Sequence, residues 1–229
     1  MGARNQQTKQ SHNIFYMTKF EFNETNTFCI SVNSERWERM ERRFQQEKLQ
    51  VTRWKASTPN TLIDQFNDFL NPLQKACAQS HIDIWRCIIQ QNLPYGFIME
   101  DDACFDQNWK SKLDEFPEDD DFDAIFLNAS EPMIPTFTWD IVLEQYFGGG
   151  YILSQEGAKW LIRNFENNYC STDWMTTRLQ ERGKSYSYFP WLIIQEGKDT
   201  TIGSGVDLDH QKVIICLNEI NYSLSNYNV

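Results

Sequence analysis

Apolar residues in the first part of the chain follow two spacings, one typical of strands and one typical of helices. Residues 28–32 form a short apolar run of β type. Residues 35–49 then carry apolar side chains at helical spacing, and Ser34 is the expected N-cap. Residues 51–56 form the next apolar run. The order strand, helix, strand predicts the opening of a βαβ unit.

The alternation of helical and strand-like segments continues along the chain. A helical stretch at 72–91 leads into an apolar strand at 97–99. Further elements are expected at 106–116 (helix), 123–127 (strand), 148–153 (strand after a glycine turn), 155–164 (helix after Ser154), 173–182 (helix) and 185–189 (strand). Residues 137–147 and the tail after residue 203 show no clear period. The fold predicted is α/β, with a mostly parallel central sheet flanked by helices.

The domain boundaries follow from where the pattern starts. Residues 1–16 are polar and patternless, so a leader or a disordered arm is expected there. The rest, 17–229, suits one α/β domain by length. No apolar run reaches the length of a membrane span. The six cysteines lack C-x-x-C spacing, and we expect them to be buried, reduced thiols of a cytoplasmic protein.

Composition narrows the classes of ligand. Hydrophobic residues make up 41% of the chain and aromatic residues 14%, which is enough for a sizeable core. The net charge of -11 argues against a nucleic-acid partner, because phosphate backbones are bound by Lys and Arg. An acidic protein that binds an anionic nucleotide would be expected to recruit a divalent cation.

Three carboxylates, Glu100, Asp101 and Asp102, directly follow the apolar strand at 97–99. They would lie at the C-terminal edge of the sheet, where open α/β sheets bind ligands. Such oxygens suit Mg²⁺ or Mn²⁺, which bridge to substrate phosphates. In an extended chain, Glu100 and Asp102 would converge and Asp101 would point elsewhere. A solvated acidic turn explains the triplet alone equally well, and it is the better interpretation of the run at 119–121.

The helical stretch at 72–91 carries Cys77, Ser80 and His81. Cys77 shares a helix face with each of the other two, so a Cys-His metal pair is one interpretation. Adjacent Ser80 and His81 do not face each other, which argues against a nucleophile–base pair. By periodicity alone, His81 is more typical of a hydrogen-bonded packing residue.

Two later features also carry candidate chemistry. Gly148-Gly149-Gly150 would let the backbone approach a ligand, but no G-x-G-x-x-G or G-K-[ST] pattern follows. A plain turn explains the glycines as well. Asp173 begins a predicted helix, where capping is the ordinary role of an aspartate and general-base catalysis is the alternative.

In this order, the segments resemble the family 25 glycosyltransferases, which include lipooligosaccharide and collagen galactosyltransferases. The resemblance extends from about residue 28 to residue 204, and Ala76 stands where the family usually has glycine. The segments that carry it are FCISVNSERWERMERRF, the Cys-x-x-Ser-His element ACAQSHIDIW, YGFIMEDDACF, GGGYILSQEGAKWLI, the Asp before a helix, and Gln195 to Ser204. The chain also looks like capsid-glycosylating enzymes of large algal viruses.

The resemblance implies a GT-A fold with a Rossmann-like sheet, in which the acidic triplet resembles the D-x-D motif. Asp102 would be the principal ligand of Mn²⁺ or Mg²⁺. Glu100 would contact the metal or the ribose, and Asp101 would support the site or contact the ribose. The other residues expected to contact the donor are Ser31, Val32, Asn33, Arg36, Arg39, Ser80, His81, Gly149 and Gly150.

The activity implied is a metal-dependent, inverting transfer of sugar from a nucleoside-diphosphate sugar, with UDP-sugar favoured, to a hydroxyl of a glycan or glycoprotein. Asp173 matches the position of the general base. The cytoplasm, or the host cytoplasm for a viral enzyme, is the expected location. One alternative is a metal-dependent nucleotidyltransferase or phosphohydrolase, with Asp123 or Asp173 as the second carboxylate. The other is a non-enzymatic carbohydrate-binding module, supported by the aromatic content.

Overall fold

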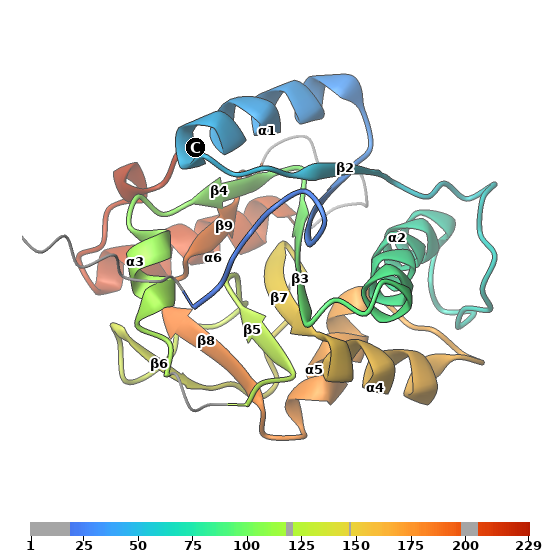
Figure 1. Ribbon diagram of the computed structural model, residues 1–229. Coiled ribbons are helices and arrows are strands. Elements are labelled where there is room, and N and C mark those ends of the chain that lie inside the picture. The colour runs from blue at the N-terminus through green and yellow to red at the C-terminus, as the bar shows by residue number, and fades with distance from the viewer. Residues whose placement is uncertain (1–18, 118–120, 147, 198–205) are drawn as a thin grey trace, which may run out of the picture.

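Seven strands form the central sheet, in the order β2-β1-β3-β7-β5-β8-β6, and β4 and β9 form a separate two-stranded sheet (Figure 1). The computed structural model describes residues 19–117, 121–146, 148–197 and 206–229. The strands are β1 (Thr27–Ser31), β2 (Thr52–Lys55), β3 (Tyr95–Glu100), β4 (Ala103–Phe105), β5 (Ala124–Phe126), β6 (Thr138–Ile141), β7 (Gly150–Ser154), β8 (Ser185–Phe189) and β9 (Ile193–Gln195). The expected leader at 1–16 lies outside the described residues, as do Asp119, Asp120, Phe147 and Ser204.

Most strands of the large sheet run in one direction. β1 pairs in parallel with both β2 and β3, and β5 pairs in parallel with β8. β7 is antiparallel to its neighbours β3 and β5, and β6 is antiparallel to β8 at the edge. The prediction of a mostly parallel sheet is therefore confirmed, although the strand after the glycines runs against the others.

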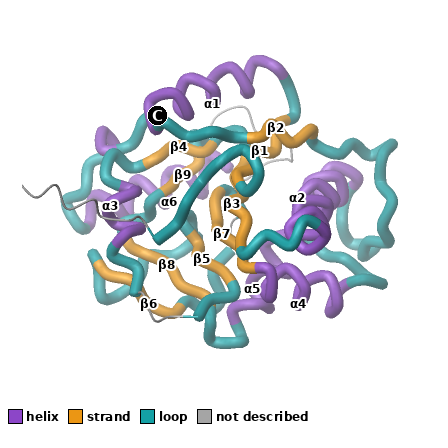
Figure 2. The backbone as a smooth tube through the Cα atoms, in the orientation of Figure 1, coloured by secondary structure: helices purple, strands orange, loops and turns teal. Residues whose placement is uncertain are grey.

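Helices cover both faces of the sheet. They are α1 (Ser34–Glu47), α2 (Pro72–Gln90), α3 (Trp109–Asp114), α4 (Gln155–Phe165), α5 (Thr172–Gln180) and α6 (Val206–Glu219), followed by the short 3-10 helix η1 (Leu224–Asn226). In Figure 2, α2, α4 and α5 lie together on the right and α1 lies across the top. None of the described helices is long and apolar enough to cross a membrane.

Alternation along the strands divides the core into two clusters. Ile98 and Tyr151 belong to the cluster that contains residues of α2, α4, α5 and α6. Their chain neighbours Phe97 and Ile152 belong to the cluster that contains residues of α1 and α3. Because successive side chains of a strand point to opposite faces, β3 and β7 are buried on both sides. This explains why they consist of continuous apolar runs.

Most predicted elements are confirmed within a few residues, and three points need correction. The N-cap of α1 is Asn33 and not Ser34, because the Asn33 side chain accepts the backbone N–H of Arg36 at 2.8 Å. The helix expected at 106–116 is limited to Trp109–Asp114. The described part of the unpatterned tail contains α6, and the aromatic stretch before the glycines contains β6.

Candidate functional site

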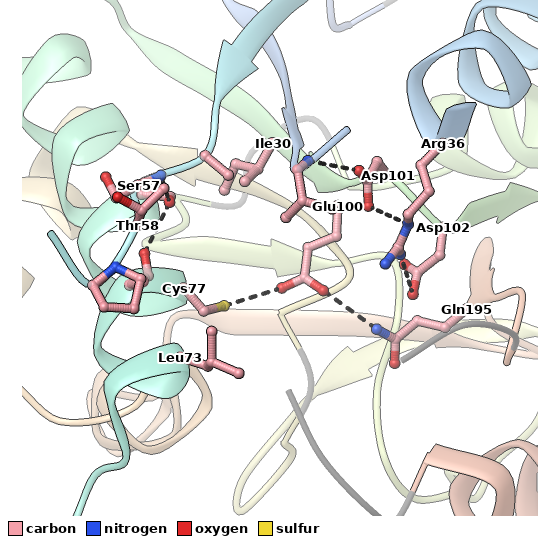
Figure 3. A pocket seen from close by; sticks show the side chains of 15 residues that line it. Ile30, Arg36, Ser57, Thr58, Leu73, Cys77, Glu100, Asp101, Asp102 and Gln195 are labelled. Atoms are coloured by element: carbon pink, nitrogen blue, oxygen red, sulfur yellow. Dashed lines mark hydrogen bonds and ion pairs between the residues drawn. The ribbon is translucent and has the colours of Figure 1, made fainter. Parts of the chain in front are cut away.

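A cavity of about 300 Å³ lies beyond the C-terminal ends of β1, β2 and β3, against the first half of α2 (Figure 3). We call it the first cavity. Its lining combines apolar side chains, small polar groups and all three residues of the acidic triplet. It is lined by Ile30, Val32, Arg36, Ala56, Ser57, Thr58, Pro59, Leu73, Ala76, Cys77, Ser80, Glu100, Asp101, Asp102 and Gln195.

The acidic triplet reaches the first cavity because β3 ends there. Glu100 is the last residue of β3 and lies opposite Ile30 of β1 in the sheet register. The chain then turns at Asp101 and Asp102. Alternation of side chains does not hold across this turn, so the expectation that Asp101 would point elsewhere is wrong. All three carboxylates line the first cavity.

Arg36 of α1 joins the triplet to the end of β1. Its Nε lies 2.8 Å from Asp101 Oδ1, and its Nη2 lies 3.2 Å from Asp102 Oδ2. The backbone N–H of Val32 donates to Asp101 Oδ2 at 2.9 Å. Arg36 is only 6% exposed, so its charge acts on the two aspartates with little screening by water. Asp101 therefore serves as a structural link between β1, α1 and β3.

The single positive charge of Arg36 does not neutralise the negative charges of the three carboxylates. Burial and the charge of Glu100 raise the pKa of Asp102 to about 7, although Arg36 acts in the opposite direction. Burial also raises the pKa of Asp101 against the effect of Arg36. Asp102 Oδ1 is buried and has no hydrogen-bond partner of good geometry among the described residues, although the Gln195 amide is near enough to the Asp102 carboxylate to oppose the rise of its pKa. Carboxylate oxygens with a buried, unpartnered atom beside a cavity are a donor set that fits Mg²⁺ or Mn²⁺.

Glu100 is held by a chain of buried hydrogen bonds. His81 of α2 is fully buried, with Nε2 at 3.2 Å from Glu100 Oε1 and Nδ1 at 2.9 Å from the hydroxyl of Tyr151. The indole N–H of Trp85 donates to the same hydroxyl at 2.9 Å. Since an indole only donates, the Tyr151 proton is left for His81 Nδ1, and His81 Nε2–H then donates to Glu100. Every polar hydrogen in this chain has an acceptor.

These bonds keep Glu100 ionised. Burial raises its pKa, but the hydrogen bond from His81 and the charge of Arg36 outweigh that effect, so the pKa is below its usual range. Cys77 Sγ lies 3.8 Å from Glu100 Oε1, and burial raises the pKa of the thiol well above its ordinary value. The thiol is therefore protonated and directed at the carboxylate.

Cys77, His81 and Glu100 also form a group whose ligand atoms lie within 4.8 Å of one another. A metal on His81 Nε2 would move the imidazole proton to Nδ1 and take away the acceptor of the Tyr151 proton. An unsatisfied buried donor costs about 1–3 kcal/mol. The arrangement is therefore explained better by hydrogen bonding than by the Cys-His metal pair that the sequence allows.

The other residues expected to contact the donor divide into two groups. Val32 and Ser80 line the first cavity, and the Ser80 hydroxyl accepts the N–H of Ser57 at 2.8 Å, which fixes the segment after β2. Ser31 donates to the carbonyl of Asn33, and neither residue lines the first cavity. Their expected donor contacts stay predictions.

Arg39, Gly149 and Gly150 also lie outside the lining of the first cavity. Arg39 is 3.5 Å from Glu196 and 3.4 Å from Glu35, so of the two arginines considered, Arg36 is the one at the triplet. The glycines permit close packing. A Cβ on Gly149 would lie 3.0 Å from Gln195 Cγ, and one on Gly150 would lie 2.8 Å from an Ile193 methyl carbon. Gln195 lines the first cavity, so Gly149 contacts a residue of the site, whereas Gly150 packs against the core through Ile193.

Asp173 is the second residue of α5 and Ser171 is the N-cap, so Asp173 is not the N-cap residue, although its carboxylate accepts a backbone N–H in the first turn of the helix. Burial raises the pKa of Asp173, and the charge of Glu100 raises it further. The charge of Asp173 also acts on Cys77. Asp173 thus lies close to the Glu100 end of the first cavity without lining it.

The sequence analysis missed Gln195 and the segment after β2. Gln195 is the last residue of β9, and its Nε2 donates to Glu100 Oε2 over a distance of 3.4 Å. The motif that ends at Ser204 was the only sign of Gln195 in the sequence. Ala56, Ser57, Thr58 and Pro59 follow β2 directly. The rule that parallel strands end at one edge of a sheet would have placed them beside the triplet.

Known proteins are similar to this chain over much of its length. The profile of Glycosyltransferase family 25 (LPS biosynthesis protein) matches residues 24–147, more than half of the chain. The lipooligosaccharide biosynthesis protein lic2B of Haemophilus influenzae is 26% identical over 223 residues, which cover 82% of this chain and 84% of the relative. The lacto-N-neotetraose biosynthesis glycosyltransferase LgtE of Neisseria meningitidis serogroup B is 24% identical over 174 residues, 62% of each chain.

The family match and the site coincide in the sequence. The matched range contains Arg36, His81 and the acidic triplet, whereas Asp173 and Gln195 lie beyond it. The resemblance found in the motifs is thereby confirmed over the first half of the site. The chain belongs to glycosyltransferase family 25 and is a glycosyltransferase.

Proposed function

We propose that this glycosyltransferase moves a sugar from a nucleoside-diphosphate sugar, with UDP-sugar favoured, to a hydroxyl of a glycan or glycoprotein, and that Asp102 and Glu100 hold Mn²⁺ or Mg²⁺. The observation that carries the metal proposal is the buried, unpartnered Asp102 Oδ1 beside the first cavity. A bound divalent ion would compensate the carboxylates and stabilise the charge that develops on the leaving diphosphate.

The first cavity has the composition of a nucleotide site. Ile30, Val32 and Leu73 supply apolar contacts for a base, while Ser57 and Thr58 offer hydroxyls. The net charge of -11 makes an unassisted diphosphate a poor ligand, which supports the need for a cation. In this proposal, His81 and Gln195 hold the Glu100 carboxylate in one orientation from two sides.

Asp173 is proposed as the general base. It would accept the proton of the acceptor hydroxyl while the hydroxyl oxygen attacks the anomeric carbon. The bond from that carbon to the diphosphate breaks, and the nucleoside diphosphate leaves with the electron pair, so the configuration inverts. Burial raises the pKa of Asp173, which makes it a better proton acceptor than an exposed aspartate.

The names of the relatives suggest the acceptor. One acts in lipooligosaccharide biosynthesis and the other in lacto-N-neotetraose biosynthesis. We infer that the acceptor here is a surface glycan of the same general kind. The six cysteines form no disulfide, which supports a reducing, cytoplasmic location. A viral source stays a prediction.

The nucleotidyltransferase or phosphohydrolase alternative needs a second carboxylate beside the metal, with Asp123 or Asp173 as the candidates. Asp123 is paired with Arg182 at 2.7 Å, just before the start of β5. The first cavity opens at the opposite ends of the parallel strands. Asp173 is near Glu100 but belongs to α5 and not to a strand end. The carbohydrate-binding alternative predicts glycan binding without a nucleotide or a metal.

A panel of UDP- and GDP-sugars tests the proposal. Each donor is added to the purified protein with and without Mn²⁺. Thermal stabilisation is measured, together with the release of nucleoside diphosphate in the presence of a glycan acceptor. We expect one UDP-sugar to stabilise the protein only when Mn²⁺ is present, because a ligand that binds the native state stabilises it. Stabilisation of equal size without Mn²⁺ would refute the metal proposal. Release of free sugar 1-phosphate would favour the phosphohydrolase.

A further inference from the structure

A second cavity, of about 490 Å³, lies next to Asp173. Ser171 and Trp174, which flank Asp173 in sequence, both line it. Leu70, at the entrance to α2, lines it as well, while Leu73, three residues later, lines the first cavity. The charge of Glu100, which lines the first cavity, acts on Asp173, and the residues on both sides of Asp173 line the second cavity. A molecule in the second cavity would therefore lie beside the turn of α5 that carries the proposed base.

The lining of the second cavity is aromatic and uncharged. It consists of Asn67, Phe69, Leu70, Asn164, Phe165, Asn168, Cys170, Ser171 and Trp174. Phe69 is 93% exposed and Trp174 is 40% exposed, and the rings of Trp174 and Phe165 meet edge to face at 5.8 Å. The second cavity therefore has exposed aromatic surface along its lining, which a ligand could cover.

The combination of rings and amides identifies the chemistry of that ligand. A pyranose has apolar C–H faces and hydroxyl groups around its rim. Aromatic rings present electron-rich faces that attract C–H groups, and asparagine amides both donate to and accept from hydroxyls. No Lys or Arg is among the described lining residues, so an anionic ligand such as a nucleotide is not favoured. The lining suits an uncharged saccharide.

We propose that the second cavity binds a neutral saccharide, the acceptor glycan, and directs its reacting hydroxyl to Asp173. This inference rests on the proposed function, because it takes Asp173 as the base. Phe69 and Trp174 would stack on sugar rings, and the three asparagines would hydrogen-bond their hydroxyls. The two substrates would then meet between the cavities, with the donor against the triplet and the acceptor against α5.

Binding of saccharide alone tests the proposal independently of catalysis. Saturation-transfer NMR is recorded for the full chain with lactose, cellobiose, maltose and N-acetyllactosamine, without donor or metal. We expect at least one to bind, and Phe69→Ala and Asn168→Ala each to weaken it about tenfold. Phe69→Ala removes an exposed ring, so the fold is not at risk. The matched control is Ile63→Ala, which removes a side chain that is 76% exposed outside the second cavity.

Kinetics then separate this inference from the proposed function. If the enzyme transfers sugar to one of these saccharides, Phe69→Ala should raise the KM for that acceptor about tenfold. The KM for donor and the rate of donor hydrolysis should stay unchanged. Asp102→Ala should abolish transfer but retain saccharide binding. If none of the four saccharides binds, or if Phe69→Ala and Asn168→Ala bind like the control, the inference is wrong. Saccharide binding without binding of any nucleotide-sugar donor would support the second cavity as a saccharide site and would overturn the proposed function.

Discussion

Replacing Asp102 by asparagine tests the electrostatics of the acidic triplet, because it removes one charge and keeps the shape of the side chain. Asp102 is 8% exposed, and its pKa is raised to about 7 by burial and by Glu100. Asparagine can still accept a hydrogen bond from Arg36. We therefore expect Asp102→Asn to stabilise the metal-free protein and to abolish metal binding.

The magnitude follows from the pKa. The ordinary pKa of this carboxyl is 3.8, so the folded state holds the proton more tightly than the unfolded state does. Ionisation of Asp102 therefore destabilises the folded state. This destabilisation is zero at a pH below the unfolded-state pKa and grows as the pH rises towards the folded-state pKa near 7. Ionisation of Asp102 lowers the free energy of unfolding by about 2 kcal/mol near pH 5 and by about 4 kcal/mol near pH 8. Asp102→Asn removes this destabilisation, so the variant should gain more stability over the wild type at the higher pH.

Urea denaturation with EDTA present, near pH 5 and near pH 8, measures this difference. We expect the gain of Asp102→Asn to be about 2 kcal/mol larger near pH 8. The matched control is Asp68→Asn, which removes the charge of an exposed aspartate outside the first cavity. Added Mn²⁺ should stabilise the wild type and leave Asp102→Asn unchanged. A variant that is less stable than the wild type near pH 8, or equally stabilised at both pH values, would refute the reasoning.

Three further predictions concern the same site. The affinity for Mn²⁺ should rise about tenfold between pH 6 and pH 8, because the ion displaces the proton of Asp102; a pH-independent affinity measured by calorimetry would contradict this. Tyr151→Phe leaves His81 Nδ1 without its donor and should lower the free energy of unfolding by about 1–3 kcal/mol, together with the transfer rate; wild-type values of both would show that the buried chain does not position Glu100. Gly149→Ala places a methyl group 2.9 Å from Asn128 Oδ1 and 3.0 Å from Gln195 Cγ and should raise the KM for donor, because Gln195 donates to Glu100; a lower melting temperature with an unchanged KM would show that the glycine serves packing alone.

The first half of the site could be predicted because it depends on local patterns. An apolar strand that runs into Glu100, Asp101 and Asp102 places carboxylates at a sheet edge whatever the rest of the chain does. The helix with Cys77 and His81 is likewise encoded by periodicity. Family motifs added roles that periodicity cannot supply.

The rest of the site depends on tertiary contacts. Arg36 and Arg39 lie three residues apart on one helix, and only packing decides that Arg36 reaches the triplet. The bond between His81 and Tyr151 joins residues 70 positions apart. The turn at Asp101 depends on the hydrogen bond from Val32, which the strand pattern does not encode.

Short or weakly periodic elements escaped prediction for a related reason. β4 and β9 have three residues each, so neither shows an alternation, yet their pairing carries Gln195 to Glu100. β6 pairs at the sheet edge, where its half-exposed residues do not form an apolar run. Their structure comes from the strands they pair with.

Calorimetric titration of UDP into the protein, with and without Mn²⁺, tests the central claim most directly. The account predicts that UDP binds the wild type and the control Asp68→Ala only with Mn²⁺ present, and that Asp102→Ala does not bind it under either condition. Equal binding of UDP by the wild type and Asp102→Ala in the presence of Mn²⁺ would contradict the claim that Asp102 holds the metal.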